Sequence, residues 1–367
     1  MSAIIMLHGV GGTGDTWSRF APAFRAKGWR VETPTLRPDR RVAENPPADL
    51  PKLRLKDYID DIAALAATLE AETGVAPVLF GHSMGGLIVQ KLLERGVGRA
   101  GVLVTPASPA DCRGPSVPAQ AVTFANILFS GDVGGKSHKI WRWGFSWGVL
   151  NRVPRAKHAG IYAGTVYDSG GVYTDIAYPD RDPERSAYVD ETKITAPILT
   201  LGGARDRAVP IGDVRLLAEK YSRIGGDYLE YPDHAHWIVD EPGSDQVIAD
   251  ILTWLANKGL TPEAAPKKAA PKAKPVAARA PVKPVAAVKP EVSKAPAPEA
   301  KAKAKKVVKA KAVAPASKAP AKPAAAKAVK VAPAVKTAVA KPAPAKAKPA
   351  AKAPSKAKAP VRKPKST

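Results

Sequence analysis

The segment Gly81-His82-Ser83-Met84-Gly85-Gly86 constrains the fold more than any other stretch of the sequence. It follows the short apolar run Val78-Leu79-Phe80 and precedes apolar residues at helical spacing. This order predicts a strand, a sharp turn and a helix, with the pattern G-x-S-x-G at the turn. Such a turn brings the backbone so close to its neighbours that Gly81 and Gly85 must lack side chains. It also raises the Ser83 hydroxyl at the sheet edge, which predicts an enzyme with a serine nucleophile.

The composition divides the chain into two parts near residue 261. Residues 262–367 hold 26 Lys, 2 Arg and 3 Glu, and they contain no aromatic residue, Gly, Leu or Ile. Such a segment cannot bury enough apolar surface to offset chain entropy, so we expect a disordered basic tail. Residues 1–261 hold 29 basic and 30 acidic residues, a net charge of −1, so the tail with its net +25 accounts for the +24 of the whole chain. The prediction is one near-neutral folded domain over 1–261.

The number of cysteines and the apolar segment at the N-terminus bear on the cellular location of the protein. The single cysteine, Cys112, excludes an internal disulfide and suits a reducing compartment. The apolar run Ala3–Leu7 has the length of a strand and ends at His8-Gly9, which predicts neither a signal peptide nor a transmembrane helix. We therefore expect a cytoplasmic protein, with nucleoid or granule association through its tail.

Strand-like and helix-like patterns alternate through the first 261 residues. The predicted strands are 3–7, 30–33, 78–80, 102–105, 198–201 and 228–231, and the predicted helices are 16–27, 55–72, 84–95, 211–222 and 247–257. Repeated strand–helix units predict a mostly parallel, doubly wound α/β sheet with helices on both faces. Residues 110–193 interrupt this rhythm and are rich in Pro, Gly and aromatics, which predicts a cap insertion over the active face.

The cap aromatics have two interpretations. They can form a small core of the cap itself, or one or two can line an apolar substrate pocket. The pocket candidates are Trp141, Trp143 and Trp147 in the cap and Trp237 beyond it.

A serine nucleophile needs a base and an orienting acid. His234 and His236 follow the strand 228–231 and are the candidate bases. The remaining histidines lie in the glycine turns (His8, His82) or in the cap (His138, His158). Asp206, after the strand 198–201, is the candidate acid, with Asp111 as its rival. The order Ser83, Asp206, His is that of the α/β-hydrolase triad.

The turn that leaves the first strand, Leu7 to Gly14, is rich in glycine and can direct backbone N–H groups inward. Together with the N–H of Met84 it predicts an oxyanion hole. The alternative is a phosphate loop, because Gly9 to Gly14 also matches G-x-G-x-x-G. A dinucleotide site needs an acidic residue closing the second strand, where Glu32 is followed by Thr33-Pro34-Thr35.

These motifs resemble those of the α/β-hydrolase family, in its esterase, lipase and acyl-hydrolase group, over residues 3–257. The resemblance rests on His8-Gly9, the Ser83 turn with Gly81 and Gly85, the surroundings of Asp206, and Ala235-His236-Trp237. It implies that His236 is the catalytic base and that Val10 and Met84 supply the oxyanion N–H groups. Ala235 stands where the family commonly has glycine. The family's first antiparallel hairpin is not seen, which implies a sheet of about six strands.

The resemblance implies a serine esterase that uses an acyl-enzyme intermediate, without metal or other cofactor, on small apolar esters. Thioesterase and other chemistries also occur on this fold. The alternative is a binding protein and not an enzyme: a nucleic-acid- or granule-associated protein that uses the hydrolase fold as a scaffold without significant catalysis. For the tail, evenly spread lysines predict binding to DNA, RNA, polyphosphate or an anionic surface without sequence specificity. A solubilising tail that binds nothing is the alternative.

Overall fold

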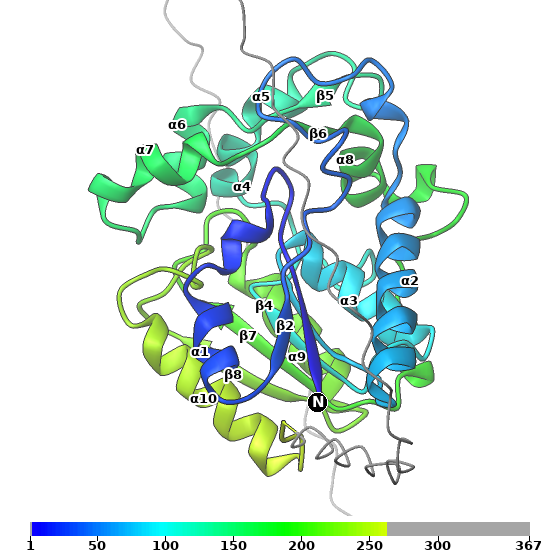
Figure 1. Cartoon of the computed structure of the whole chain (residues 1–367). Coiled ribbons are helices and arrows are strands. Elements are labelled where there is room, and N and C mark those ends of the chain that lie inside the picture. Colours follow the sequence, from blue (N-terminus) through cyan, green and yellow to red (C-terminus); the bar gives the residue numbers. More distant parts are fainter. Residues whose placement is uncertain (1, 263–367) are drawn as a thin grey trace, which may run out of the picture. The chain divides into compact units, whose positions relative to one another are not determined.

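The computed structural model describes residues 2–262, and the predicted tail therefore lies outside the described residues except for Pro262. A six-stranded sheet organises the described chain, with the order β2-β1-β3-β4-β7-β8 and every neighbouring pair parallel (Figure 1). Its strands are β1 (Ala3–Leu7), β2 (Arg30–Glu32), β3 (Val78–His82), β4 (Ala100–Val104), β7 (Ile198–Gly203) and β8 (Asp227–Tyr231). The predicted mostly parallel sheet of about six strands is confirmed.

Helices cover both faces of this sheet. They are α1 (Phe20–Ala26), α2 (Leu55–Thr73), α3 (Met84–Glu94), α9 (Ile211–Ser222) and α10 (Ser244–Asn257). Helices α1 and α10 pack on one face, and α2, α3 and α9 pack on the other. Side chains alternate across a strand, so Ile4 and Met6 of β1 enter the first core while Ile5 and Leu7 enter the second. Two covered faces explain why the central strands are apolar without interruption.

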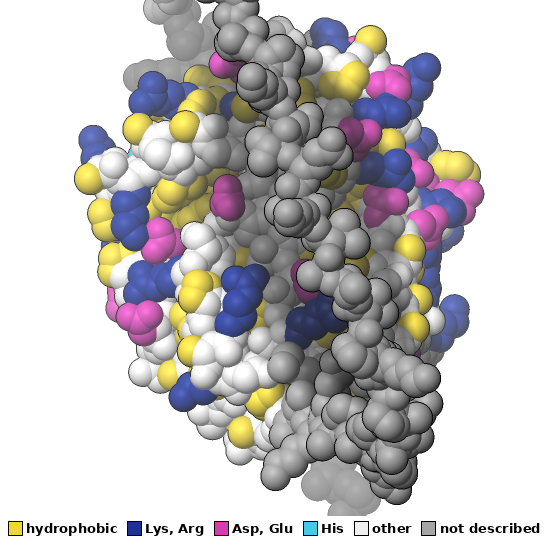
Figure 2. Space-filling view, in the orientation of Figure 1, with side chains coloured by type: hydrophobic (Ala, Val, Ile, Leu, Met, Phe, Trp, Pro, Cys, Tyr) yellow, Lys and Arg dark blue, Asp and Glu magenta, His cyan; other side chains and the backbone are white. Residues whose placement is uncertain are grey.

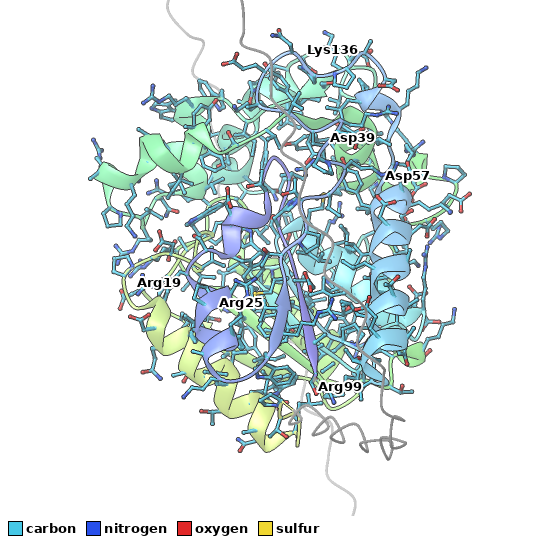
Figure 3. The ribbon with its side chains drawn as sticks, viewed as in Figure 1. Arg19, Arg25, Asp39, Asp57, Arg99 and Lys136 are labelled. Carbon is cyan, nitrogen blue, oxygen red and sulfur yellow. The ribbon has the colours of Figure 1, made fainter. Side chains whose placement is uncertain are left out.

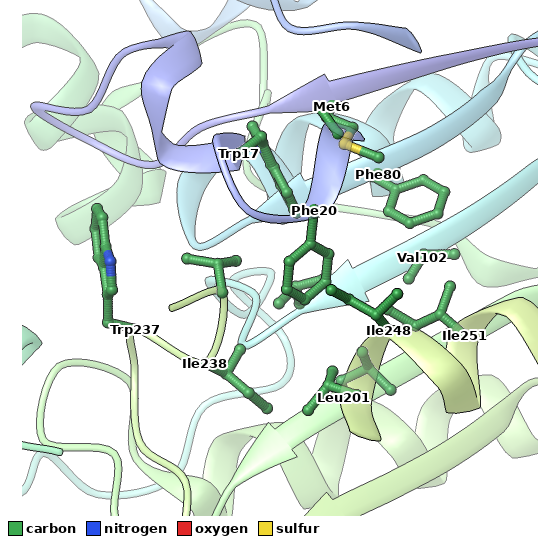
Figure 4. Packing of buried hydrophobic residues seen from close by; sticks show 14 of the residues in the cluster. Met6, Trp17, Phe20, Phe80, Val102, Leu201, Trp237, Ile238, Ile248 and Ile251 are labelled. Atoms are coloured by element: carbon green, nitrogen blue, oxygen red, sulfur yellow. The ribbon is translucent and has the colours of Figure 1, made fainter. Parts of the chain in front are cut away.

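The predicted helix over 16–27 is divided in the structure. A 3₁₀ turn, η1 (Gly14–Trp17), precedes α1, which begins only at Phe20. Pro22 has no N–H to donate and is tolerated in the first turn of a helix, so α1 cannot extend far before it. The division places Trp17, Phe20 and Phe24 together in the first core, near Phe80 (Figure 4).

Short elements fill the chain between β4 and β7. They are α4 (Pro118–Thr123), α5 (Ala125–Leu128), β5 (Ser137–His138), α6 (Arg142–Gly144), the π-helical turn η3 (Phe145–Val149), α7 (Arg155–Ala163), β6 (Asp168–Ser169), α8 (Gly170–Ala177), and the 3₁₀ turns η4 (Pro179–Arg181) and η5 (Glu191–Lys193). A further 3₁₀ turn, η2 (Leu50–Lys52), precedes α2. The elements α4 to α8 lie beyond the carboxyl ends of the strands (Figure 1). We refer to residues 110–193 as the cap.

The surface of the described chain mixes charges of both signs. Figure 2 shows basic and acidic side chains interspersed over the visible face, and ion pairs such as Arg37–Asp61 and Arg215–Glu230 join them. Among residues 2–262, no helix has both the length and the apolar character needed to cross a bilayer.

We predict that Phe80→Ala lowers the free energy of unfolding by about 3–5 kcal/mol, because it leaves a cavity between the sheet and α1. The Phe80 ring is fully buried and meets Phe24 edge-on, with ring centroids 5.1 Å apart. Urea unfolding followed by circular dichroism measures the effect. The matched control is Phe129→Ala, because Phe129 is 87% exposed and its loss should change stability by less than about 0.5 kcal/mol. Equal losses for the two variants would contradict the prediction.

Candidate functional site

Ser83 occupies a strained turn between β3 and α3. Its backbone angles are φ 54° and ψ −122°, a conformation that costs a non-glycine residue about 1–3 kcal/mol. Close packing imposes this turn. A Cβ on Gly81 would lie 2.2 Å from the carbonyl oxygen of Gly85, and one on Gly85 would lie 2.4 Å from that of Leu7. Both positions therefore require glycine, as the sequence predicts.

His236 lies in the loop after β8, and its imidazole contacts Asp206 from the loop after β7. The Nδ1 atom donates a hydrogen bond to Asp206 Oδ2 at 2.8 Å. The other carboxylate oxygen accepts the backbone N–H groups of Ala208 (2.7 Å) and Val209 (2.9 Å). With the proton held on Nδ1, the Nε2 atom of His236 is free to act as a base.

His82, inside the serine turn, holds the backbone of the histidine loop. Its Nε2 donates to the carbonyl oxygen of His236 at 2.8 Å, and the Thr105 hydroxyl donates to the same oxygen at 3.0 Å. Burial, together with the neighbouring His236, lowers the pKa of His82 to about 3. A neutral His82 therefore ties the serine turn to the loop that carries His236.

The glycine-rich turn after β1 lies against the serine. A Cβ on Gly9 would lie 2.8 Å from the Ser83 Cβ, so no side chain fits between the turn and the serine. Among the backbone hydrogen bonds of the described loops and turns, none uses the N–H of Val10 or of Met84. Met84 is the first residue of α3, where an N–H has no partner within the helix. Both N–H groups are therefore available to a ligand oxygen.

A cavity joins these groups. It is narrow, with a volume of about 20 Å³, and its lining residues are Gly9, Val10, Gly12, Thr16, His82, Ser83, Phe124, Ile140, Phe145, Val149, His236 and Trp237. The cap supplies Phe124, Ile140, Phe145 and Val149, so its residues form an apolar wall opposite Ser83. None of the lining residues carries a formal charge at neutral pH unless a histidine is protonated.

Of the four tryptophans proposed for the pocket, the structure places only Trp237 at the cavity. Trp143 stacks on Trp147 with ring centroids 5.5 Å apart and lies 5.1 Å from Trp141, and none of the three lines the cavity. The reason is helical spacing. Phe145 and Val149 are four residues apart and face inward, so Trp143 and Trp147, offset by two residues, face away. Their assignment to the pocket is therefore corrected.

The rival candidates have other partners. Lys220 Nζ donates to Asp111, and the nitrogen Nδ1 of His234 lies 3.1 Å from Glu241 Oε2. Glu32, the residue a dinucleotide site would use, accepts a hydrogen bond from Arg30. Within residues 2–262, no three His, Cys, Asp or Glu side chains are grouped so that they could hold a metal ion.

A buried ion pair that the sequence analysis missed supports the glycine-rich turn. Asp168, in the cap strand β6, accepts the backbone N–H of Gly11 and the Nη2 of Arg41, each at 2.9 Å. Its second oxygen accepts the Tyr58 hydroxyl at 2.8 Å. Arg41 also donates to the carbonyl oxygen of Gly12 at 3.0 Å, and both charged side chains are fully buried. The pair therefore holds both sides of the turn and connects it to the cap.

His8 completes this support as a neutral residue. Its Nδ1 donates to the Gly9 carbonyl oxygen at 2.8 Å, and its Nε2 accepts the backbone N–H of Leu36 at 3.1 Å. Burial, with the adjacent Arg41 guanidinium, lowers the pKa of His8 to about 3. No local pattern marks Arg41 or Asp168 in the sequence, because their partners are distant along the chain.

Comparisons with known proteins bear on the family and the fold of the chain. The family model described as "Alpha/beta hydrolase family" matches residues 4–250. The monoacylglycerol lipase of Mycolicibacterium smegmatis is 24% identical over 215 residues, which cover 55% of this chain and 70% of that protein.

Two solved structures share the fold. A methylesterase from Arabidopsis superposes with a TM-score of 0.52 at 12% identity, covering 70% of this chain and all of its own. The monoacylglycerol lipase of Paleococcus ferrophilus gives a TM-score of 0.51 at 21% identity, covering 70% of this chain and 94% of its own.

We predict that Asp168→Asn lowers the free energy of unfolding at pH 7 by about 3–5 kcal/mol, because it leaves the Arg41 charge buried without its partner. Urea unfolding measures the loss, and Asp233→Asn is the control, since the Asp233 side chain is 80% exposed. Burial alone would raise the pKa of Asp168, but Arg41 and the hydrogen bonds from Gly11 and Tyr58 lower it overall. Its stabilisation is therefore present above the unfolded pKa of about 3.9 and is lost as the pH falls through the lower folded value. The two unfolding free energies should converge in acid, and a constant gap would count against the charge as the cause.

Proposed function

Because the chain belongs to the alpha/beta hydrolase family, we propose that it is a serine hydrolase of carboxylic esters. Ser83 is the nucleophile, His236 the general base and Asp206 the residue that orients the base. The observation that carries this proposal is the 2.8 Å hydrogen bond from His236 Nδ1 to Asp206, at a cavity that both Ser83 and His236 line. The strained backbone of Ser83 supports it, since strain of this kind persists where function requires it.

In the proposed reaction, Ser83 Oγ attacks the ester carbonyl while His236 Nε2 takes the hydroxyl proton. The negative charge on the former carbonyl oxygen is stabilised by the N–H groups of Val10 and Met84. Protonated His236, stabilised by Asp206, gives its proton to the departing alcohol. Water then attacks the acyl-enzyme through the same base, which releases the carboxylic acid and restores Ser83.

The cavity lining indicates the class of substrate. Aromatic and aliphatic side chains from the cap face the serine, and no Lys, Arg, Asp or Glu is among the lining residues. Binding a charged group there would leave it unpaired, which is costly. We therefore infer uncharged esters, and the similarity to a monoacylglycerol lipase supports a lipid-like alcohol or acyl part. The scaffold alternative is less well supported, because a protein that used the fold only as a scaffold would need neither a strained serine nor an oriented histidine at the same cavity.

Labelling with a fluorophosphonate probe and turnover of p-nitrophenyl esters test the assignment. Ser83→Ala should abolish labelling and lower kcat by about 10⁴-fold or more, and Asp206→Asn should lower kcat by about 10²–10⁴-fold with little change in KM. The control is Ser146→Ala, because the Ser146 hydroxyl bonds His158 in the cap and lies outside the cavity. Labelling that survives in Ser83→Ala and disappears in Ser146→Ala would overturn the assignment.

For residues 262–367 we propose binding to a polyanion, on composition alone. The segment carries 28 basic and 3 acidic residues, and it has no aromatic side chain to stack on bases. Contacts of this kind neutralise phosphates, so their strength falls steeply with salt and does not depend on sequence.

A mobility-shift assay with double-stranded DNA compares the full chain with a chain that ends at Pro262. The full chain should bind DNA of any sequence, with affinity that falls by about 10³-fold or more between 50 and 200 mM salt. The shorter chain should bind far more weakly, because residues 1–261 are nearly neutral overall. Equal affinity of the two chains would disprove the role of the tail.

A further inference from the structure

The outer side of the cap exposes a group of large apolar side chains. Of the eight large apolar residues most exposed in residues 2–262, five lie between positions 122 and 143. They are Val122 (37% exposed), Leu128 (40%), Phe129 (87%), Trp141 (38%) and Trp143 (52%), and we call them the cap patch. Exposed apolar groups of this kind mark interaction sites.

Hydrogen bonds hold the segments of the cap patch together. The Trp141 indole donates to the carbonyl oxygen of Thr123 at 3.3 Å, and the Trp141 N–H donates to the Asn126 side chain at 3.2 Å. Trp143 lies against Trp141 in turn. The chain at 141–143 is therefore docked on α4 and α5, and these exposed rings belong to an ordered surface.

The same part of the cap is strongly basic. Residues 118–165 contain six basic residues and one acidic residue, although residues 1–261 as a whole are nearly neutral. Two of the six, Arg152 and Lys157, form ion pairs with carboxylates from outside the cap. The other four form no ion pair with a carboxylate of the described chain: Lys136, Lys139, Arg142 and Arg155. Lys136 extends outward at the cap end of the molecule in Figure 3, far from Arg99 at the opposite end.

The cap patch and the candidate active site are two sides of one segment. Phe124, Ile140 and Phe145 line the cavity that contains Ser83, while Phe129, Trp141 and Trp143, close to them in sequence, face outward. Neighbouring residues of the same segment therefore form the cap patch and the cavity wall.

We propose that the cap patch docks on an anionic lipid membrane. Tryptophan and phenylalanine enter the boundary between headgroups and acyl chains, and lysine and arginine next to them meet the lipid phosphates. Exposed rings together with cations that form no ion pair in residues 2–262 fit that boundary, although Glu44 acts electrostatically on Lys139. Docking itself requires only this surface, whereas its use, to bring membrane-dissolved esters to the cavity, rests on the proposed function.

Vesicles of ether-linked phosphatidylglycerol and phosphatidylcholine test the proposal with the full chain. Ether lipids contain no ester bond, so binding is measured whether or not the protein is a hydrolase. The tail also attracts anionic vesicles, so flotation is measured at about 0.15 M and at about 1 M NaCl. At 1 M the Debye length is about 3 Å, so the charges of the tail and of the cap are both screened and the binding that remains reports insertion of the cap patch rings. Acrylamide quenching of tryptophan reports on the folded part alone, because all seven tryptophans lie in residues 1–261.

We expect the wild-type chain to float with the vesicles in high salt and its tryptophans to become protected from acrylamide. Phe129→Ser with Trp143→Ser should reduce this binding by about tenfold or more. The control replaces Leu216 and Leu229 by Ser, because they are similarly exposed but lie outside the cap. Circular dichroism melting verifies that both double variants fold.

Three results would overturn the proposal. The first is wild-type binding without protection of tryptophan, which would assign binding to the tail. The second is equal high-salt binding by the cap variant and the wild type. The third is a wild-type dimer that the cap variant converts to a monomer, which would show that a second copy covers the cap patch.

Discussion

The close approach of three backbone segments at the serine turn is the constraint on which the rest of the site depends. The carbonyl of Gly85 lies where a side chain on Gly81 would be, and the end of β1 lies where one on Gly85 would be. These contacts force Ser83 into a conformation that an L-residue rarely adopts. The parallel sheet makes this possible, because β1 and β3 are neighbours and their carboxyl ends reach the same edge. The glycine-rich turn after β1 thus meets the serine turn after β3.

A second constraint connects the sheet to the cap. Asp168 enters from the cap strand β6 and binds Arg41 and the turn that carries Val10. Leaving either charge unpaired at this depth would cost much more free energy than the pair contributes to stability. The ion pair therefore acts mainly by fixing how the glycine-rich turn and the cap are arranged. It makes the position of the glycine-rich turn dependent on the cap being folded. The geometry of the proposed oxyanion hole and the folding of the cap are therefore coupled through this buried ion pair and through the backbone hydrogen bond from Val166 to Gly11.

The cap has different chemistry on its two sides. Its inner side gives Phe124, Ile140, Phe145 and Val149 to the cavity, and its outer side carries Trp141 and Trp143 together with basic residues that form no ion pair with a carboxylate of the described chain. On the helical turn at 143–149, residues four apart share a side, so the two-residue offset of Trp143 from Phe145 places them on opposite sides. The alternating aromatic residues of this region therefore contribute to both the cavity wall and the exposed cap patch.

Much of this fold is determined locally and could be predicted from the sequence. Apolar periodicity records which face of each helix or strand is buried, so α2, α9 and the six strands were predicted close to their observed bounds. The predicted contact between Asp206 and His236 is also present, because strand ends in a parallel sheet converge on one edge. Only the tertiary structure decided that Arg41 pairs with Asp168, that Trp143 faces outward, and that Asp111 binds Lys220. In two of these contacts the partners lie 127 and 109 residues apart in the sequence. No periodic pattern predicts such pairs, because they depend on how the cap folds back on the sheet.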